Sequence, residues 1–327
     1  MQQRQLGKNG QMVGAVALGC MSFAGFYGAT SEKESHQTLA AALDLGVTHL
    51  DTARIYGDGV SEEIIGSFLR NNPARFSIAT KGGIRTQPTR GFDNSEEFLR
   101  ECLEGSLKRL GVEHVDLYYI HRRDQTIPIE DVMGTLVRFK EEGKIGGIGF
   151  SEISPSSLER AAAVHPVMAV QSEYSLWTRQ PELGMIQACK RLGTAFVPFS
   201  PLARGMFGEM TPDPASFAGR DIRIGNPRFV EPNFSTNVAR INRFKKFAHE
   251  RGLEPAALAL RWVLDQGDHL IPIPGTRTQA HLAINASADA IRLDEGDHAE
   301  IAAILPPGFA HGSRYSDAQA IGVEVYC

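Results

Sequence analysis

The feature that most constrains the fold of this chain is a regular alternation between short β-rich runs and longer segments with helical periodicity. The short runs are apolar on both faces, which is typical of parallel strands covered by helices. The eight runs are AVALG (15–19), VTHLD (47–51), FSIATK (76–81), VDLYYI (115–120), KIGGIGF (144–150), VMAVQ (167–171), TAFVPFS (194–200) and HLIPIP (269–274). Several of the helical segments between them end in glycine, at Gly46, Gly111 and Gly143, where a helix commonly terminates.

Eight strand–helix units predict one α/β domain over residues 1–327, a closed (β/α)8 TIM barrel. A doubly wound nucleotide-binding sheet usually has fewer strands and a GxGxxG turn after the first. The turn here reads LGCMSFAGFYG and lacks that spacing. Before the first strand, RQLGKNGQMV predicts a β-hairpin that turns at Asn9-Gly10 and closes the bottom of the barrel. Residues 201–234 have no clear period and predict a long loop at the C-terminal face, a kind of segment that is often functional.

The bulk composition excludes several classes of protein. Hydrophobic residues make up 42% and charged residues 22%, with a net charge of −4, so nothing favours nucleic acid or an anionic membrane as a partner. The four cysteines lie far apart, which predicts reduced thiols, two of them in the core, in a cytoplasmic protein. No stretch approaches the roughly 18 apolar residues of a membrane span. The ten histidines form no metal-binding tract. An oligomer is possible, but no feature indicates one.

Four polar residues fall at or just after the C-terminal ends of neighbouring strands, where barrel enzymes place their chemistry. They are Asp51, Tyr56, Lys81 and His121. A phenol has a pKa of about 10, and a nearby ammonium lowers that value, so we expect Lys81, held by Asp51, to lower the pKa of Tyr56. We expect His121 to hydrogen-bond the same substrate oxygen. Each residue alone would more often serve packing or the surface. Together they could protonate an oxygen as a hydride reaches the adjoining carbon, help worth about 10²–10⁴ in rate.

These segments resemble the aldo-keto reductase superfamily. DTARIYG, ATKGG and YYIHRRD match the family's catalytic segments, and they place Asp51, Tyr56, Lys81 and His121 in the catalytic positions. The resemblance continues through GKIGGIGFSEIS, QSEYSLW, VPFSPLARG and IPIPGT, and it is strongest to microbial reductases of the pyridoxal-reductase and YakC-like kind. It implies NADPH-dependent reduction of a small aldehyde or ketone to an alcohol, with Tyr56 as general acid. It also implies that NADP(H) binds without a Rossmann fold.

The resemblance further implies a set of cofactor-binding residues. The carboxamide is expected at Ser151, Glu152 and Gln171, and the nicotinamide face at Phe199. The pyrophosphate is expected at Ser200, Leu202 and Arg204. The adenosine 2′-phosphate is expected at Gly275, Thr276, Arg277, His281 and Asn285. An aromatic ring suits stacking, and a guanidinium suits a phosphate.

Three departures from the family pattern affect this assignment. Glu152 replaces an Asn that is common in relatives, and a carboxylate can accept a hydrogen bond but cannot donate one. His281 and Ile284 replace a common Arg and Glu, which leaves the preference for NADP over NAD open. Phe199 replaces a common Tyr, a change expected to be nearly neutral for stacking.

Aromatic residues predict an apolar mouth for the substrate. Phe23, Phe26 and Tyr27 lie in the first loop and Trp177 follows the sixth strand, although packing of the loops explains each of them equally well. The polar tail GFAHGSRYSDAQAIGVEVYC is expected to close one rim.

Other functions remain open at this point. A glycoside hydrolase could use Glu152 and Glu173 as its carboxylate pair, but it would leave Tyr56 and Lys81 unexplained. An NADP-binding redox sensor or regulatory subunit with little turnover is a second alternative. A metal-dependent hydrolase is disfavoured because no His-x-His pair stands at a strand end.

Overall fold

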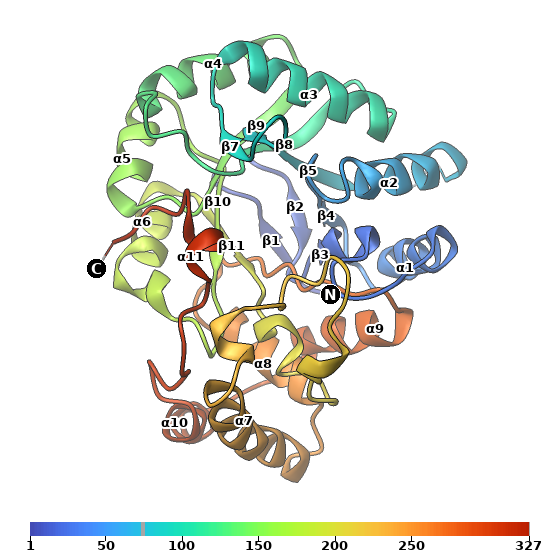
Figure 1. Ribbon diagram of the computed structural model, residues 1–327, viewed down its shortest axis with the longest axis vertical. Helices are drawn as coiled ribbons and strands as arrows, with labels where there is room; N and C mark the ends of the chain where they lie inside the picture. Colours follow the sequence, from blue (N-terminus) through green and yellow to red (C-terminus); the bar gives the residue numbers. More distant parts are fainter. Residues whose placement is uncertain (73–75, 327) are drawn as a thin grey trace.

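The computed structural model describes residues 1–72 and 76–326. Within these residues, seven parallel strands form one curved sheet that helices surround (Figure 1). In spatial order the strands are β3 (Leu18–Gly19), β4 (His49–Asp51), β5 (Ser77–Gly82), β8 (Val115–Ile120), β9 (Ile145–Ser151), β10 (Ala169–Glu173) and β11 (Ala195–Phe199). The helices are α1 (Glu32–Asp44), α2 (Val60–Asn71), α3 (Glu96–Leu110), α4 (Ile129–Glu141), α5 (Pro155–Val164), α6 (Met185–Leu192), α7 (Asn233–Glu250), α8 (Pro255–Leu264), α9 (Gln279–Ser287), α10 (Glu295–Ile304) and α11 (Asp317–Ala320). The predicted barrel architecture is confirmed.

The eighth predicted strand, at 269–274, is not formed as a strand, although the segment does occupy the eighth position. The N–H groups of Ile271 and Ile273 donate to backbone carbonyls of β11 at 2.9 and 3.0 Å. Pro272 and Pro274 accept bonds from the chain at β3 at 2.9 and 3.2 Å. Because proline has no N–H group, the return bonds to β3 are missing. The barrel therefore closes through a half-complete ladder at this seam.

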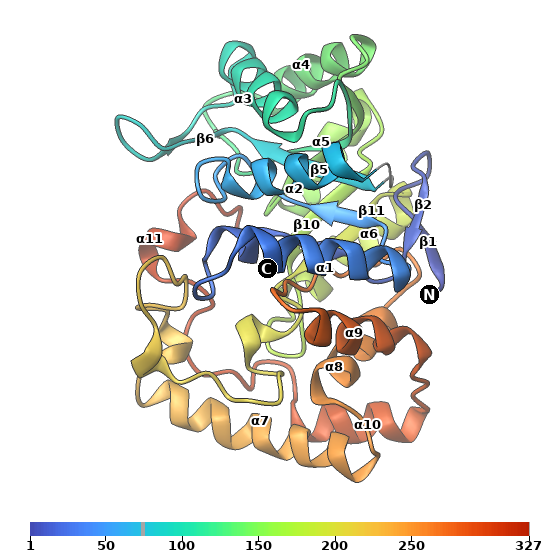
Figure 2. The ribbon, with the colours of Figure 1, turned by 90° about the vertical axis from the view of Figure 1, so that its right-hand side faces the viewer.

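The N-terminal hairpin closes the bottom of the barrel, as predicted. Its antiparallel strands are β1 (Gln3–Gln5) and β2 (Met12–Gly14). Leu6 and Val13 are buried in the cluster of side chains that fills the barrel interior. The Arg4 guanidinium donates to three backbone carbonyls between residues 264 and 270 at 2.6–2.8 Å, which ties the hairpin to the seam. Figure 2 shows the hairpin at the end of the barrel opposite β6 and α11.

The ends of the helices follow local sequence signals. Gly46, Gly111 and Gly143 all have positive φ, between 68° and 75°, just beyond α1, α3 and α4, as predicted. The side chains of Ser31 and Ser95 accept hydrogen bonds from backbone N–H groups in the first turns of α1 and α3. These caps define where the helices begin and end, and so how long the loops around the barrel mouth are.

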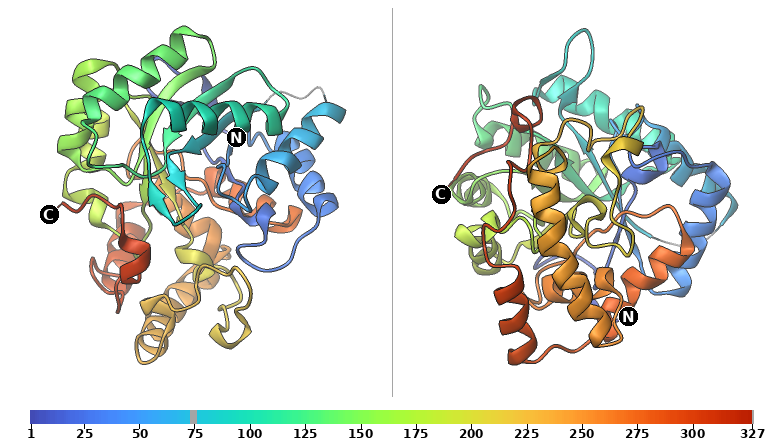
Figure 3. Two further views of the ribbon diagram at one scale, coloured as in Figure 1. Left: turned by 45° about the horizontal axis from the view of Figure 1, so that its top comes forward. Right: turned by 60° about the horizontal axis from the view of Figure 1, so that its bottom comes forward.

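Three segments without long helices surround the C-terminal end of the barrel (Figure 3). They are the loop after β11, the small antiparallel hairpin formed by β6 (Ile84–Arg85) and β7 (Gly91–Phe92), and the C-terminal segment that carries α11. The loop after β11 contains only short 3-10 turns until α7 begins at Asn233, which confirms the predicted long loop.

The described part of the chain contains no helix with the length and apolarity needed to cross a membrane. Cys20, Cys102 and Cys189 are buried free thiols, one more core cysteine than predicted. The fourth cysteine, Cys327, lies outside the described residues.

The hairpin plug predicts a contrast between two substitutions on neighbouring residues. Leu6 is fully buried, so Leu6→Ala should lower the free energy of unfolding by about 2–5 kcal/mol through lost burial and a residual cavity. Met12, in the same hairpin, is 53% exposed, and Met12→Ala should change it by less than about 0.5 kcal/mol. Denaturant unfolding followed by circular dichroism measures both. Equal effects would mean that the hairpin does not seal the core.

Candidate active site

A cavity of about 830 Å³ opens at the C-terminal ends of the strands. Strand ends, the first loop, the loop after β11 and the C-terminal segment line it. The structure brings most of the predicted site residues to this cavity. Those that line it are Phe26, Tyr27, Asp51, Tyr56, His121, Ser151, Gln171, Phe199, Ser200, Leu202, Arg204, Gly275, Thr276, Arg277, His281 and Asn285.

Beneath the cavity floor lies a buried lysine held by three oxygen atoms. Lys81 is fully buried, and its Nζ forms an ion pair with Asp51 Oδ1 and donates to the Thr52 carbonyl at 2.8 Å. Nζ also lies 3.4 Å from the Tyr56 hydroxyl, which lines the cavity. Gln171 Nε2 donates to the other Asp51 oxygen at 2.8 Å. The predicted Asp51–Lys81–Tyr56 arrangement is thus present as a connected network.

Local backbone structure sets these positions. Asp51 ends β4 and Lys81 lies near the end of the adjacent β5, so parallel pairing brings the two side chains together. Tyr56 sits in a tight turn, because its N–H donates to the Ala53 carbonyl at 3.0 Å and its carbonyl accepts from Ser61 at 3.2 Å. As a result, the Tyr56 side chain lies next to the Lys81 ammonium.

The electrostatics differ in one respect from the sequence-based expectation. Burial raises the pKa of Tyr56 by more than the nearby Lys81 ammonium lowers it, so the net pKa lies above 10 rather than below. For Lys81 itself, burial lowers the pKa, but the attraction of Asp51 and Tyr56 outweighs this effect and the net pKa is raised. The site therefore pairs a charged ammonium with a protonated phenol.

His121 lies beside Tyr56 and is neutral. The two rings meet edge to face with centroids 5.9 Å apart. Burial, reinforced by the positive charges of Lys81, Arg122 and Arg90, holds the pKa of His121 well below its usual range. Its Nδ1 is buried without a hydrogen-bond partner among the described residues, so Nε2 is the nitrogen available to a ligand in the cavity.

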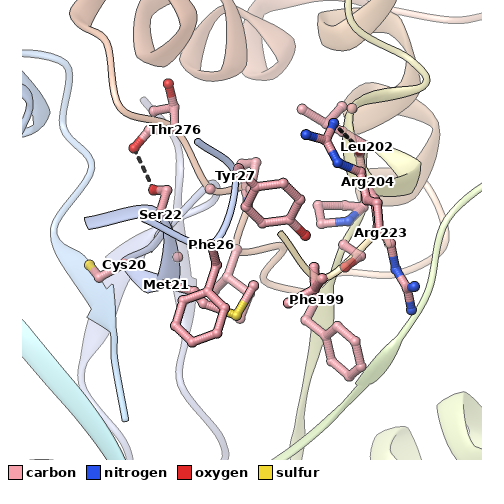
Figure 4. A pocket seen from close by; sticks show the side chains of 18 of the residues that line it. Cys20, Met21, Ser22, Phe26, Tyr27, Phe199, Leu202, Arg204, Arg223 and Thr276 are labelled. Atoms are coloured by element: carbon pink, nitrogen blue, oxygen red, sulfur yellow. Dashed lines mark hydrogen bonds between the residues drawn. The ribbon is translucent and has the colours of Figure 1, made fainter. Parts of the chain in front are cut away.

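The loop that begins at Ser200 has the features of a clamp for an anionic ligand. Ser200, Ala203 and Arg204 all have φ between 49° and 57°, a backbone state that costs roughly 1–3 kcal/mol each and is common at ligand clamps. The Arg204 guanidinium is buried against Glu173 at 3.2 Å, yet its Nε has no partner among the described residues. Figure 4 shows Tyr27 of the first loop beside Arg204, and the Arg223 guanidinium lies 5.3 Å from the centre of the Tyr27 ring.

Besides Lys81, which lies beneath the cavity floor, three predicted site residues do not line the cavity. Glu152 instead receives a bidentate ion pair from Arg314 of the C-terminal segment, a partner that cannot be inferred from sequence order. Phe23 is 1% exposed in the core, and Trp177 packs on Phe229 with ring centroids 5.8 Å apart. Both aromatic side chains pack in the interior and do not line this cavity.

Sequence reasoning also missed several cavity residues. Arg122 follows His121 directly, so the strand-end rule itself could have found it. Arg90 on the β6–β7 hairpin carries no comparable sequence signal. Tyr315 comes from the tail, which was expected to close a rim, and the Arg204 guanidinium lies 5.0 Å from its ring. No group of three or more potential metal-ligating His, Cys, Asp or Glu side chains occurs among the described residues.

The chain matches the model of the Aldo/keto reductase family over residues 15–306. It is 40% identical to the probable aldo-keto reductase 1 of Glycine max, over 96% of this chain and 92% of that one. It is 38% identical to the aldo-keto reductase yakc [NADP(+)] of Schizosaccharomyces pombe, over 93% of this chain and 92% of that one.

Two solved structures share the fold. A glycerol dehydrogenase from Gluconobacter oxydans matches with a TM-score of 0.84 and 30% identity, over 93% of this chain and 94% of that one. An aldo/keto reductase from Klebsiella pneumoniae, solved in complex with NADP and acetate, matches with a TM-score of 0.74 and 23% identity, over 97% and 99%. The fold and site define an oxidoreductase of the barrel type. The chain belongs to the aldo/keto reductase family.

The Lys81–Asp51 pair predicts a strongly non-additive mutant cycle. Asp51→Asn leaves a fully buried ammonium without its countercharge and should cost about 3–5 kcal/mol of unfolding free energy. Asp51→Asn combined with Lys81→Met should cost clearly less than the sum of the two single variants. Chemical denaturation of all four proteins measures the coupling.

The exposed pair Lys246–Glu250 is a matched control, and Glu250→Gln should have an effect below about 0.5 kcal/mol. If the changes in unfolding free energy of the two single variants simply add in the double variant, Asp51 and Lys81 do not form a buried ion pair.

Proposed function

We propose that this enzyme uses NADPH to reduce an aldehyde or ketone to the corresponding alcohol, with Tyr56 as general acid. The single observation that carries the proposal is the fully buried Lys81 Nζ, 3.4 Å from the hydroxyl of Tyr56 at the cavity floor. A lysine ammonium in that place stabilises the phenolate that remains after the phenol has given up its proton.

The chain's own residues account for the proton transfer. Tyr56 donates its hydroxyl proton to the carbonyl oxygen, and Lys81 stabilises the developing phenolate. Asp51 and Gln171 hold Lys81 in place through the network described above. Neutral His121 lies beside Tyr56, where Nε2 can hydrogen-bond the same oxygen and orient the carbonyl.

Cavity residues also fit the cofactor. Ser151 and Gln171 offer polar groups for a carboxamide, Phe199 a ring for stacking, and Arg204 and Arg277 guanidinium groups for phosphates. The orphaned Nε of buried Arg204 is the observation that favours an anionic ligand here. When bound, NADPH supplies the hydride that the carbonyl carbon accepts. The name of the fission-yeast relative, which includes NADP(+), supports the choice of cofactor.

The glycoside hydrolase alternative loses its support in this geometry. Glu152 and Glu173 are both engaged by arginines, Arg314 and Arg204 respectively, and neither carboxylate lines the cavity. A hydrolase of this class needs two carboxyl groups that face the substrate.

Tyr56→Phe tests the proposed acid. Removal of the hydroxyl should lower kcat by about 10²–10⁴ while NADPH binding stays within about twofold, because the phenol acts only on the transferred proton. NADPH absorbance against a panel of aldehydes and ketones measures turnover, and quenching of protein fluorescence measures binding. Full activity in this variant would overturn the assignment. Tight NADPH binding by the wild type without turnover of any carbonyl would favour a sensor or regulatory role instead.

The pH profile provides an independent test. Since the pKa of Tyr56 is raised above 10, its proton is present throughout the neutral range and is lost only as the pH rises through that raised value. The pKa of His121 is lowered well below 6.5, so it stays neutral. We therefore expect kcat/KM for the carbonyl, at saturating NADPH, to be flat from about pH 7 to pH 9. An alkaline decline centred between pH 7 and 9 would contradict a protonated Tyr56 as the acid.

A further inference from the structure

Two arginines line the catalytic end of the cavity without a carboxylate partner. They are Arg90, on the β6–β7 hairpin, and Arg122, directly after the catalytic His121. Among the described residues, no Asp or Glu oxygen lies within 4.0 Å of either guanidinium. The Arg122 side chain is half-buried, and Arg90 is exposed. Both cations are therefore available to a ligand that enters the cavity.

This arrangement differs from that of the other arginines around the cavity. Arg204 pairs with Glu173 and Arg223 pairs with Asp221, so a carboxylate already faces each charge, and the buried Nε of Arg204 is left without a partner among the described residues. Arg277 has no carboxylate partner among the described residues, but it lies against the first loop, where its guanidinium donates to the Ala29 carbonyl. Uncompensated positive charge at the Tyr56 end is thus a separate feature of the site.

Arg122 is held close to the reacting groups. Its Nη1 donates to the His121 carbonyl at 2.7 Å and to Ser151 Oγ at 3.0 Å. Only one of its terminal nitrogens makes these bonds, so a guanidinium edge remains for a further acceptor. Arg122 and Arg90 line the same cavity as His121, and their positive charges add to the effect of burial, which is the main cause of the lowered pKa of that ring.

Acidic residues do not cancel this charge. Asp51, the carboxylate on the cavity floor, is neutralised by Lys81. Glu209 and Glu254 also line the cavity, but Glu209 lies in the loop after β11 and Glu254 lies directly before α8. The walls nearest Tyr56 otherwise contain apolar groups such as Ile84 and Phe26. An anion at this end would meet two cations in a partly apolar setting, where charge attraction is stronger than in water.

We propose that the substrate is a carbonyl compound that also carries an anionic group, a carboxylate or a phosphate, which Arg122 and Arg90 bind while the carbonyl oxygen lies at Tyr56. The proposal rests on the carbonyl reduction proposed above. The anionic group takes no part in the bond changes. Its attraction to the two guanidinium groups positions the carbonyl and selects acids over neutral analogues of the same shape.

A matched pair of aldehydes provides the test. 4-Carboxybenzaldehyde and its methyl ester, methyl 4-formylbenzoate, present the same aldehyde with and without a negative charge. In the wild type, kcat/KM should be at least about tenfold higher for the acid, because a hydrogen-bonded charge is worth roughly 1.5–3 kcal/mol. 4-Formylphenyl phosphate, measured beside the acid, distinguishes a preference for phosphate from one for carboxylate.

Substitutions assign the preference to the two arginines. Arg122→Gln should lower the ratio of acid to ester kcat/KM by about 10- to 100-fold. Arg90→Gln, at an exposed position where folding is not at risk, should lower that ratio by about two- to fivefold. Arg85→Gln is the matched control, because Arg85 is an exposed arginine of the same hairpin that does not line the cavity. The acid-to-ester ratio of kcat/KM in Arg85→Gln should stay within about twofold of the wild-type ratio, which excludes a general effect of net charge.

Three outcomes would overturn the inference. They are a wild-type enzyme that favours the ester or does not discriminate, an acid-to-ester ratio that neither arginine substitution changes, and a loss of NADPH affinity in Arg90→Gln or Arg122→Gln without a change in that ratio. The last result would assign these cations to the cofactor. Reduction of both aldehydes without discrimination would leave the proposed function standing and refute only the substrate class. No NADPH-dependent turnover of any aldehyde would refute the proposed function itself.

Discussion

A lysine ammonium that is buried away from water needs a countercharge and hydrogen-bond acceptors around it, and the residues at the mouth of this barrel provide them. Removal of an ion from water costs several kcal/mol, so Lys81 is stable only because Asp51, the Thr52 carbonyl and the Tyr56 hydroxyl surround it. The parallel register of β4 and β5 supplies the first two partners, and the turn after β4 supplies the third. Gln171, from β10, fixes the remaining oxygen of Asp51, so that strands from different parts of the barrel share one network.

That network has a direct electrostatic consequence for the phenol. The ammonium lowers the pKa of Tyr56, but burial of the same hydroxyl raises it further, and the second effect is larger. The expectation from charge alone therefore had the wrong net sign. A phenol that keeps its proton at neutral pH is suited to donate it only when a strong acceptor arrives. In the proposed reaction, Lys81 matters chiefly after the proton transfer, when the phenolate is present.

Much of this architecture could be predicted from the sequence, because strand and helix periodicity and the residues at strand ends depend on local order. The placement of Asp51, Tyr56, Lys81 and His121 follows from that order, whereas most of the other cavity residues were predicted from the resemblance to the aldo-keto reductases. What could not be predicted depends on contacts between distant segments. The incomplete eighth strand is not such a case, because the missing N–H groups of Pro272 and Pro274 are a local signal in the sequence. By contrast, Arg314 draws Glu152 away from the cavity, and Trp177 is covered by the loop after β11. No periodicity reports which loop will cover which side chain.

The C-terminal segment supplies part of the cavity wall from outside the region that matches the family model, which ends at residue 306. Tyr315 and Gln319 face the cavity from this segment, and Arg314 attaches it to Glu152. The reacting groups, by contrast, all stand on the barrel. The proposed reacting groups and this part of the cavity wall thereby belong to separable parts of the chain. A change confined to the tail would therefore alter this part of the cavity wall and leave the network of Asp51, Lys81 and Tyr56 as it is.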